Sequence, residues 1–247
     1  MNKIYIRFYE ELNDHIPTEK RKIRFEHKFM GHPSVKDVIE SLGVPHCEVD
    51  MIMVNGNSVG FDYSLNDKDD VSVYPVFESI DILNVQHLRE RPLRSTKFIL
   101  DVHLGTLAKY LRMFGFDTLY QNNYNDDEII NISLDERRTI LTKDKGILKH
   151  SRVNRGYYIR NSNPEKQLIE ILDRFDLKNS FNEFTRCLDC NTLLSKIEKD
   201  KIAGRLPQKV KERQNEFYIC NGCNKIYWPG SHYLKMRELI NKVTNKF

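Results

Sequence analysis

The chain has 247 residues, of which 40% are hydrophobic and 30% are charged, a balance typical of a soluble globular protein. No apolar run approaches the roughly 18 residues that a membrane-spanning helix needs, and the first residues lack the apolar core of a signal peptide. We therefore expect a cytoplasmic protein that has no membrane partner. The net charge of +4 identifies no partner by itself, although residues 196–213 alone hold seven basic and three acidic side chains.

Residues 1–80 are expected to form a β-grasp domain, because strand and helix patterns follow in the order strand, strand, helix, strand, strand. The second half of this segment resembles the ubiquitin-like sulfur-carrier proteins, which end in a free Gly-Gly tail. Phe77-Glu78 follows the last strand instead and the chain continues, so we exclude a carrier role and expect an interaction or substrate-positioning module. The expected strands are 3–8, 22–26, 51–54 and 70–76, with Ser34 as helix N-cap, Gly43 as helix stop and Asn55-Gly56 as hairpin turn.

Residues 81–96 are expected to be a linker, with a helix-breaking Pro92 and a basic stretch from Arg89 to Lys97. Residues 97–183 then alternate short apolar strands with helical patterns, which predicts an α/β domain with a mostly parallel sheet. The strands are expected at 98–100, 118–120, 139–142 and 157–159, and the helices at 104–114, from 126 onward and at 164–175.

Acidic side chains stand at the ends of these strands. Asp101 directly follows the strand 98–100, Asp144 follows the strand 139–142, and Asp126, Asp127 and Glu128 open the helix between them. Ligands of open α/β sheets bind beyond the carboxyl ends of the strands, so these acids can converge on one point. A divalent cation such as Mg²⁺ or Mn²⁺ would neutralise such a carboxylate group. The alternative for each acid is a capping or turn role, and Asn125 is a second candidate for the cap at the helix start.

Four of the five cysteines fall into two Cys-x-x-Cys pairs that are separated by 29 residues: Cys187 with Cys190, and Cys220 with Cys223. This spacing predicts a closed, structural zinc site, so residues 184–247 are expected to form a zinc ribbon and a closing helix. Strands and a loop are expected between the pairs, and Gly222 is expected to permit a tight turn. Tyr227 and Trp228 either stack on an unpaired base or pack the ribbon. Cys47 stands apart and is expected to be structural.

Five segments resemble the Mut-seven C-terminal RNase family, a branch of the PIN-like nucleases with an appended zinc ribbon. They are LDVHLGTLAKYLRMFGFDTLY, NDDEII, ILTKDKGIL, RCLDCNTLL and CNGCNKIYWPGSH. The resemblance covers residues 97–240 and implies an α/β protein with a PIN-like parallel-sheet nuclease domain between the β-grasp domain and the zinc ribbon. PIN-like nucleases gather acids around Mg²⁺ or Mn²⁺ and cleave RNA. The resemblance therefore implies that Asp101, Asp126 and Asp144 are the metal ligands, with Asp127 or Glu128 as alternatives to Asp126.

The function expected from these features is that of a metal-dependent ribonuclease, which hydrolyses RNA phosphodiester bonds. Lys109, Arg112 and Lys143 are candidates to contact the phosphates. PIN-like domains are often dimers, so an oligomer is compatible with the resemblance, and the β-grasp domain offers a surface for a protein partner. The alternative is a noncatalytic RNA-binding or adaptor protein, in which the acids are structural.

Overall fold

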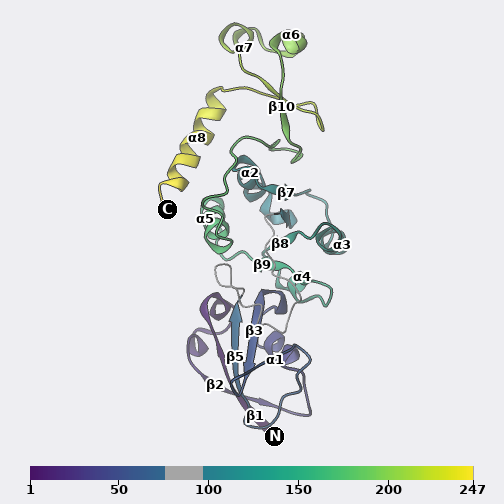
Figure 1. Ribbon diagram of the computed structural model, residues 1–247, viewed down its shortest axis with the longest axis vertical. Coiled ribbons are helices and arrows are strands. Elements are labelled where there is room, and N and C mark those ends of the chain that lie inside the picture. The colour runs from purple at the N-terminus through teal and green to yellow at the C-terminus, as the bar shows by residue number, and fades with distance from the viewer. Residues whose placement is uncertain (76–96, 247) are drawn as a thin grey trace. The chain divides into compact units, whose positions relative to one another are not determined.

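The computed structural model describes residues 1–75 and 97–246, which form two compact units (Figure 1). The first unit contains residues 1–75 and 133–158, and the second unit contains residues 97–132 and 159–246. The expected linker 81–96, most of the basic stretch from Arg89 and the residues after the last β-grasp strand lie outside the described residues. The domain limits expected from the sequence stay predictions.

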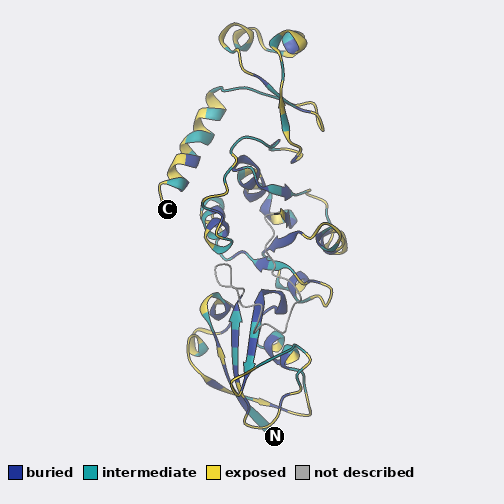
Figure 2. Cartoon of the chain, in the orientation of Figure 1, coloured by how far each residue is buried: buried dark blue, intermediate teal, exposed yellow. Residues whose placement is uncertain are grey.

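The amino-terminal part of the first unit is a five-stranded mixed sheet in the order β2-β1-β5-β3-β4. β1 and β5 are parallel neighbours at its centre, and the other pairs are antiparallel. The apolar side chains of the sheet and of helix α1 are buried together, so the inward-facing strand residues are dark in Figure 2. The elements are β1 (Asn2–Phe8), η1 (Glu10–His15), η2 (Thr18–Lys20), β2 (Phe25–Phe29), α1 (Val35–Ser41), η3 (His46–Glu48), β3 (Val49–Val54), β4 (Asn57–Val59) and β5 (Asp70–Pro75).

Local signals account for most of these boundaries. Ser34 and Asp37 form the capping box that begins α1, and Gly43 follows the helix with a φ of +103°. Asn55 and Gly56 both have positive φ, as a two-residue hairpin turn requires. The expectation of a strand at 22–26 was wrong by three residues. Lys22 adopts a left-handed φ of +60° and donates its N–H to Asn13 Oδ1, so the extended backbone of β2 begins only at Phe25.

The remainder of the first unit consists of β8 (Thr139–Thr142), α4 (Lys145–Lys149) and β9 (Gly156–Tyr158), and it packs against η3 of the β-grasp part. The Glu48 carboxylate accepts the backbone N–H of Tyr158 at 2.6 Å and lies 2.8 Å from His15 Nε2. The Cys47 thiol donates to the Leu148 carbonyl, and Lys149 Nζ donates to the Glu40 carbonyl. Helix α4 is thus held by the β-grasp residues through polar bonds in a largely buried setting.

Replacing Glu48 by Ala should lower the free energy of unfolding by about 3 kcal/mol. The substitution removes a buried carboxylate that is hydrogen-bonded to the His15 ring and to the Tyr158 N–H. The matched control is Glu26→Ala. Glu26 pairs with Lys3 at the surface of the β-grasp sheet, and this ion pair should contribute below about 1 kcal/mol. Urea unfolding followed by circular dichroism measures both changes. Equal shifts of the urea midpoint would show that the Glu48 network does not hold the first unit together.

The α/β part of the chain contains two pairs of parallel strands. β6 and β7 pair in parallel in the second unit, and β8 and β9 pair in parallel in the first unit. Helices α2 and α5 pack on each other within the second unit, where the Phe98 ring contacts Phe116 and Phe175. The elements not yet given are β6 (Lys97–Leu100), η4 (Val102–Leu104), α2 (Gly105–Met113), β7 (Asp117–Leu119), α3 (Asp126–Glu136) and α5 (Pro164–Arg174). The expected parallel-sheet α/β fold is confirmed, and helix α4 is an addition to the expected elements.

The carboxyl-terminal part of the second unit is a three-stranded antiparallel sheet in the order β10-β11-β12, followed by helix α8. The expectation of strands and a loop between the cysteine pairs was incomplete, because short helices also lie in that interval, between β10 and β11. Their apolar positions are too few to give a helical pattern, and Ile202 is the buried residue that anchors α6. The elements are β10 (Leu194–Lys196), α6 (Lys199–Ile202), η5 (Ala203–Arg205), α7 (Gln208–Arg213), β11 (Tyr218–Cys220), β12 (Ile226–Tyr227) and α8 (Ser231–Thr244). None of the helices in the described residues is long and apolar enough to cross a membrane.

Candidate functional site

The four cysteines of the two pairs converge on one point in the second unit. Their Sγ atoms all lie within 4.8 Å of one another, with 3.5 Å between Cys187 and Cys223 and 3.2 Å between Cys190 and Cys220. All four are free thiols, and a tetrahedral zinc site with bonds of about 2.3 Å would place sulfurs about 3.8 Å apart. Burial opposes ionisation of Cys190, but hydrogen bonds with Thr192 lower the pKa of its thiol to about 6. The group therefore has the number, chemistry and spacing of ligands that could hold zinc.

Two knuckle turns of the same construction bring these thiols together. Each Cys-x-x-Cys pair is followed by an asparagine with positive φ, +70° at Asn191 and +58° at Asn224, whose N–H donates to the carbonyl of the first cysteine. Gly222 does not have a positive φ, so its value to the tight turn is its lack of a side chain. A Cβ at Gly222 would stand 2.5 Å from Thr192 Oγ1, so glycine is required by the close approach of the first knuckle.

The Tyr227 hydroxyl lies beside the cluster, 3.0 Å from Cys187 Sγ, and accepts the N–H of Leu188 at 3.2 Å. Burial and the bond to Cys187 raise the pKa of Tyr227, which keeps the hydroxyl protonated and able to donate to the thiolate. Outer hydrogen bonds of this kind orient metal ligands. These contacts give Tyr227 a packing role in the ribbon, one of the two alternatives for this residue.

The first knuckle is tied to the α2–β7 turn by buried hydrogen bonds. Arg112 Nη1 donates to the carbonyls of Leu188 and Asp189 at 2.9 Å, and its Nε donates to the Thr118 carbonyl at 2.8 Å. Asn191 accepts the Thr118 N–H and donates to Asp117. The fork geometry of arginine suits several carbonyls at once. The ribbon and the end of α2 therefore form one packed body within the second unit.

The acids of the second unit stand at two helix starts. Asp101 is buried, and its Oδ1 accepts the His103 N–H at 3.0 Å at the start of η4. At the start of α3 the cap is a reciprocal pair: Asn125 Oδ1 accepts the Glu128 N–H, and Glu128 accepts the Asn125 N–H. Asp126 and Asp127 are exposed in the first turn. Asn125 rather than Asp126 is therefore the cap, and the Glu128 carboxylate is used in closing it.

Asp144 belongs to the first unit, where it begins α4. Its Oδ1 accepts the Gly146 N–H at 2.6 Å, and its own N–H donates to Thr142 Oγ1. The side chain is exposed. The capping role that was the alternative for Asp101 and Asp144 is thus present at both positions. It uses one oxygen of each carboxylate, so it does not exclude a bound cation.

The three basic candidates differ in their surroundings. Lys109 is exposed on α2, and Lys143 is half-buried just after β8. Arg112 is only 2% exposed, and its guanidinium nitrogens donate to protein carbonyls. Burial lowers the pKa of Arg112. These contacts support a structural role for Arg112, and contact of the three residues with phosphate stays a prediction.

The structure thus brings the four cysteines together, and across the described residues it shows no comparable group of acids. Convergence of Asp101, the Asp126 group (Asp126, Asp127 and Glu128) and Asp144 on one ion stays a prediction. Sequence reasoning missed the roles of Asn191 and Asn224, although the pattern Cys-x-x-Cys-Asn occurs at both knuckles. It also missed the Tyr227 hydroxyl, whose distance from the cysteines depends on the pairing of β11 and β12.

Two family models match the chain in the expected order. The Mut7-C ubiquitin model matches residues 1–81, and the Mut7-C RNAse domain model matches residues 96–240, which is 145 of the 247 residues. The second match includes the acids, the basic candidates and the four cysteines discussed above. No curated protein and no solved structure matches the chain. Because the RNAse model covers more than half of the residues, the chain belongs to the Mut7-C RNAse family.

Proposed function

We propose that this protein is a ribonuclease that hydrolyses RNA phosphodiester bonds with a divalent cation, Mg²⁺ or Mn²⁺, held by Asp101, the Asp126 group and Asp144. The observation that carries the proposal is the match to an RNAse domain across residues 96–240. Asp101 and Asp144 support it, since each follows a strand of the parallel sheet, where α/β proteins place their ligands. For the cysteine group we propose zinc as the structural ion.

The proposed roles follow from how the chain holds each carboxylate. The backbone N–H groups of His103 and Gly146 fix the orientation of Asp101 and Asp144, which prepares oxygen ligands of the kind that hard cations prefer. A bound divalent cation would neutralise charge on the phosphate and lower the pKa of an attacking water. Lys109 and Lys143 are proposed to contact flanking phosphates, where their charge would offset that of the RNA. The carboxylates themselves do not attack the substrate.

For the β-grasp part we propose a positioning role. Its residues Glu40, Cys47 and Glu48 bond residues 148–158, the segment that contains the end of α4 and strand β9. Since Asp144 begins α4, these bonds restrain the backbone that presents this acid. A sulfur-carrier role stays excluded, and the remaining β-grasp surface is proposed to serve a protein partner.

Incubation of the zinc-loaded protein with a mixed RNA pool, with and without Mn²⁺, tests the proposed activity. We expect new RNA ends that appear only with the divalent cation and that increase in proportion to the protein concentration. Sequencing of the new ends would show whether cleavage is internal or terminal. Binding of RNA without any product, at all Mn²⁺ concentrations, would instead favour the alternative of a noncatalytic RNA-binding protein. The acids would then serve only as helix caps.

A further inference from the structure

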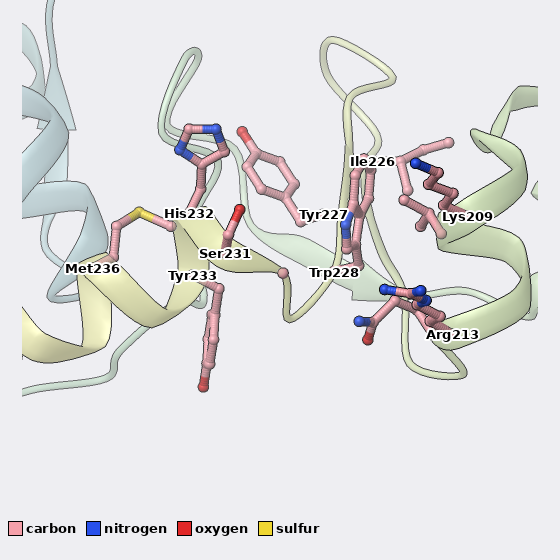
Figure 3. Close-up of a pocket in the computed structure, with 12 residues that line it drawn as sticks. Lys209, Arg213, Ile226, Tyr227, Trp228, Ser231, His232, Tyr233 and Met236 are labelled. Carbon is pink, nitrogen blue, oxygen red and sulfur yellow. The ribbon is translucent and has the colours of Figure 1, made fainter.

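A cavity of about 410 Å³ lies in the second unit between α7, the end of β12 and the start of α8 (Figure 3). Neither the acids proposed for catalysis nor the four cysteines are among the residues that line it. The side chains that define its chemistry are Lys209 and Arg213 from α7, Trp228 after β12, and His232 and Tyr233 from α8. The cavity is therefore lined by basic side chains of α7 on one side and by aromatic side chains, called the aromatic wall below, on the other.

Trp228 forms the centre of this wall. In Figure 3 its indole ring stands between the α7 side chains of Lys209 and Arg213 on one side and Tyr227 and His232 on the other. The residue is half-buried, so part of the ring is accessible from the cavity. The backbone at Gly230 lies close to this ring, because a Cβ there would stand 3.0 Å from Trp228 Nε1. The ring is thus packed beside the backbone on one side, while it still lines an open space.

The basic side chains are arranged to meet an anion. Lys209 and Arg213 are four residues apart on α7 and therefore lie on the same face of the helix. Both are exposed, and neither forms an ion pair with an acid among the described residues. No acid is present among the described residues that line the cavity. The segment around them, residues 196–213, carries seven basic and three acidic side chains, as much net charge as the whole chain.

A neighbouring cavity of about 390 Å³ shares Trp228 and Tyr227 and provides an internal comparison. Its lining includes Glu183 and Glu216, and Arg237 there is already paired with Glu183. Its two acids offset the two arginines of its lining, Arg186 and Arg237, so that wall offers a phosphate group no net positive charge. A polyanion that contacts Trp228 is therefore expected to approach from the α7 side, where the lining charge is positive.

We propose that the α7–α8 cavity binds an unpaired nucleotide of single-stranded RNA, with its base stacked on Trp228 and the neighbouring phosphates contacted by Lys209 and Arg213. Stacking on an aromatic ring combined with a basic surface is how proteins bind single strands without strong sequence preference. An acidic peptide would satisfy the basic residues but offers no flat ring for Trp228. The proposal deepens the proposed function, on which it rests, by placing a substrate-binding subsite on the ribbon.

Trp228 is the only tryptophan in the chain, so its fluorescence reports directly on this cavity. We would titrate the full-length, zinc-loaded protein, without Mg²⁺ or Mn²⁺, with a 12-nucleotide single-stranded RNA, with the matching duplex and with polyglutamate. The expected result is saturable quenching by the single strand, and much weaker quenching by the duplex and by polyglutamate. Quenching of the same strength by polyglutamate would overturn the proposal in favour of an acidic protein partner.

Variants measured by anisotropy of labelled RNA separate stacking from general charge. Trp228→Leu should weaken binding about 5- to 150-fold, the range that loss of one stacked base predicts. Lys209→Glu combined with Arg213→Glu should also weaken binding and lower its salt dependence. The single variant Lys209→Glu has Lys211→Glu as its matched control, since Lys211 is on the same helix but does not line the cavity. Zinc content and circular dichroism verify that each variant is folded.

Binding that is equal in the wild type, Trp228→Leu and the double variant would refute the subsite, and so would equal losses in Lys211→Glu and Lys209→Glu. Because binding is measured without divalent cations, its outcome is separate from that of cleavage. RNA that binds at Trp228 but is never cut would refute the proposed ribonuclease and leave the subsite standing. Mn²⁺-dependent cleavage with unchanged binding in the variants would refute the subsite alone.

Discussion

Replacing Asp144 or Asp101 by Asn should reduce the rate of RNA cleavage on the order of 100- to 1,000-fold, because a bound cation contributes several kcal/mol to transition-state stabilisation. The fold should be unaffected. Each residue caps a helix start through Oδ1, and the asparagine side-chain oxygen can accept the same N–H from His103 or Gly146. The substitution therefore removes the charge and keeps the cap. Initial rates at saturating Mn²⁺, with matched urea unfolding curves, measure both effects.

Two further variants separate catalysis from capping. Asp144→Ala removes charge and cap together, so it should lose the same activity as Asp144→Asn and a further ~1 kcal/mol of stability. Asp135→Asn is the matched control, because Asp135 is an exposed acid on α3 outside the proposed group. If Asp144→Asn and Asp101→Asn both retain full cleavage activity, the acids are caps only and the proposed catalytic site is wrong.

Removing zinc, or replacing Cys187 or Cys220 by Ser, should unfold the ribbon. Structural zinc in small domains contributes about 10–16 kcal/mol of binding free energy near neutral pH, which is as large as the whole stability of a typical domain. We expect zinc content to fall from one ion per chain to nearly none, and protease cuts to appear between residues 184 and 230. Metal analysis and mapped limited proteolysis measure these changes. Zinc retention should also fall at acidic pH, because the ligands bind as thiolates.

Cys47→Ala provides the control of the same residue type for this prediction. Cys47 is buried in the first unit, where its thiol donates to the Leu148 carbonyl, and it is outside the group of four cysteines. The variant should keep one zinc ion and an intact ribbon, at a small cost to the first unit. Full zinc content in Cys187→Ser and Cys220→Ser would contradict the four-thiolate site, even if Cys47→Ala behaved as expected.

The features that could be predicted are those set by residues close to one another in the sequence. The capping box at Ser34, the Asn55-Gly56 turn and the stop at Gly43 are local, and each is confirmed. The convergence of the four cysteines was also predictable, since a Cys-x-x-Cys spacing places two sulfurs on one turn wherever it occurs. Alternation of apolar strands with helices was enough to give the parallel sheet.

Features that depend on packing between distant segments were not predictable. No pattern in a single sequence shows that Glu48 accepts the N–H of Tyr158, 110 residues away, or that Arg112 holds the knuckle carbonyls. Arg112 therefore looked like a phosphate ligand, although its burial is set by contacts with the ribbon. The short helices α4, α6 and α7 span six residues or fewer, less than two turns, which is too short for a helical period to be recognised.

Binding of Mn²⁺ tests the central claim most directly, because it measures the proposed carboxylate site without relying on any substrate. Electron paramagnetic resonance of free Mn²⁺, titrated with zinc-loaded protein, reports the number of bound ions and their affinity. The account predicts saturable Mn²⁺ binding that is at least about tenfold weaker in Asp101→Asn and in Asp144→Asn and unchanged in Asp135→Asn. Equal Mn²⁺ affinity in the wild type and in both asparagine variants would contradict it.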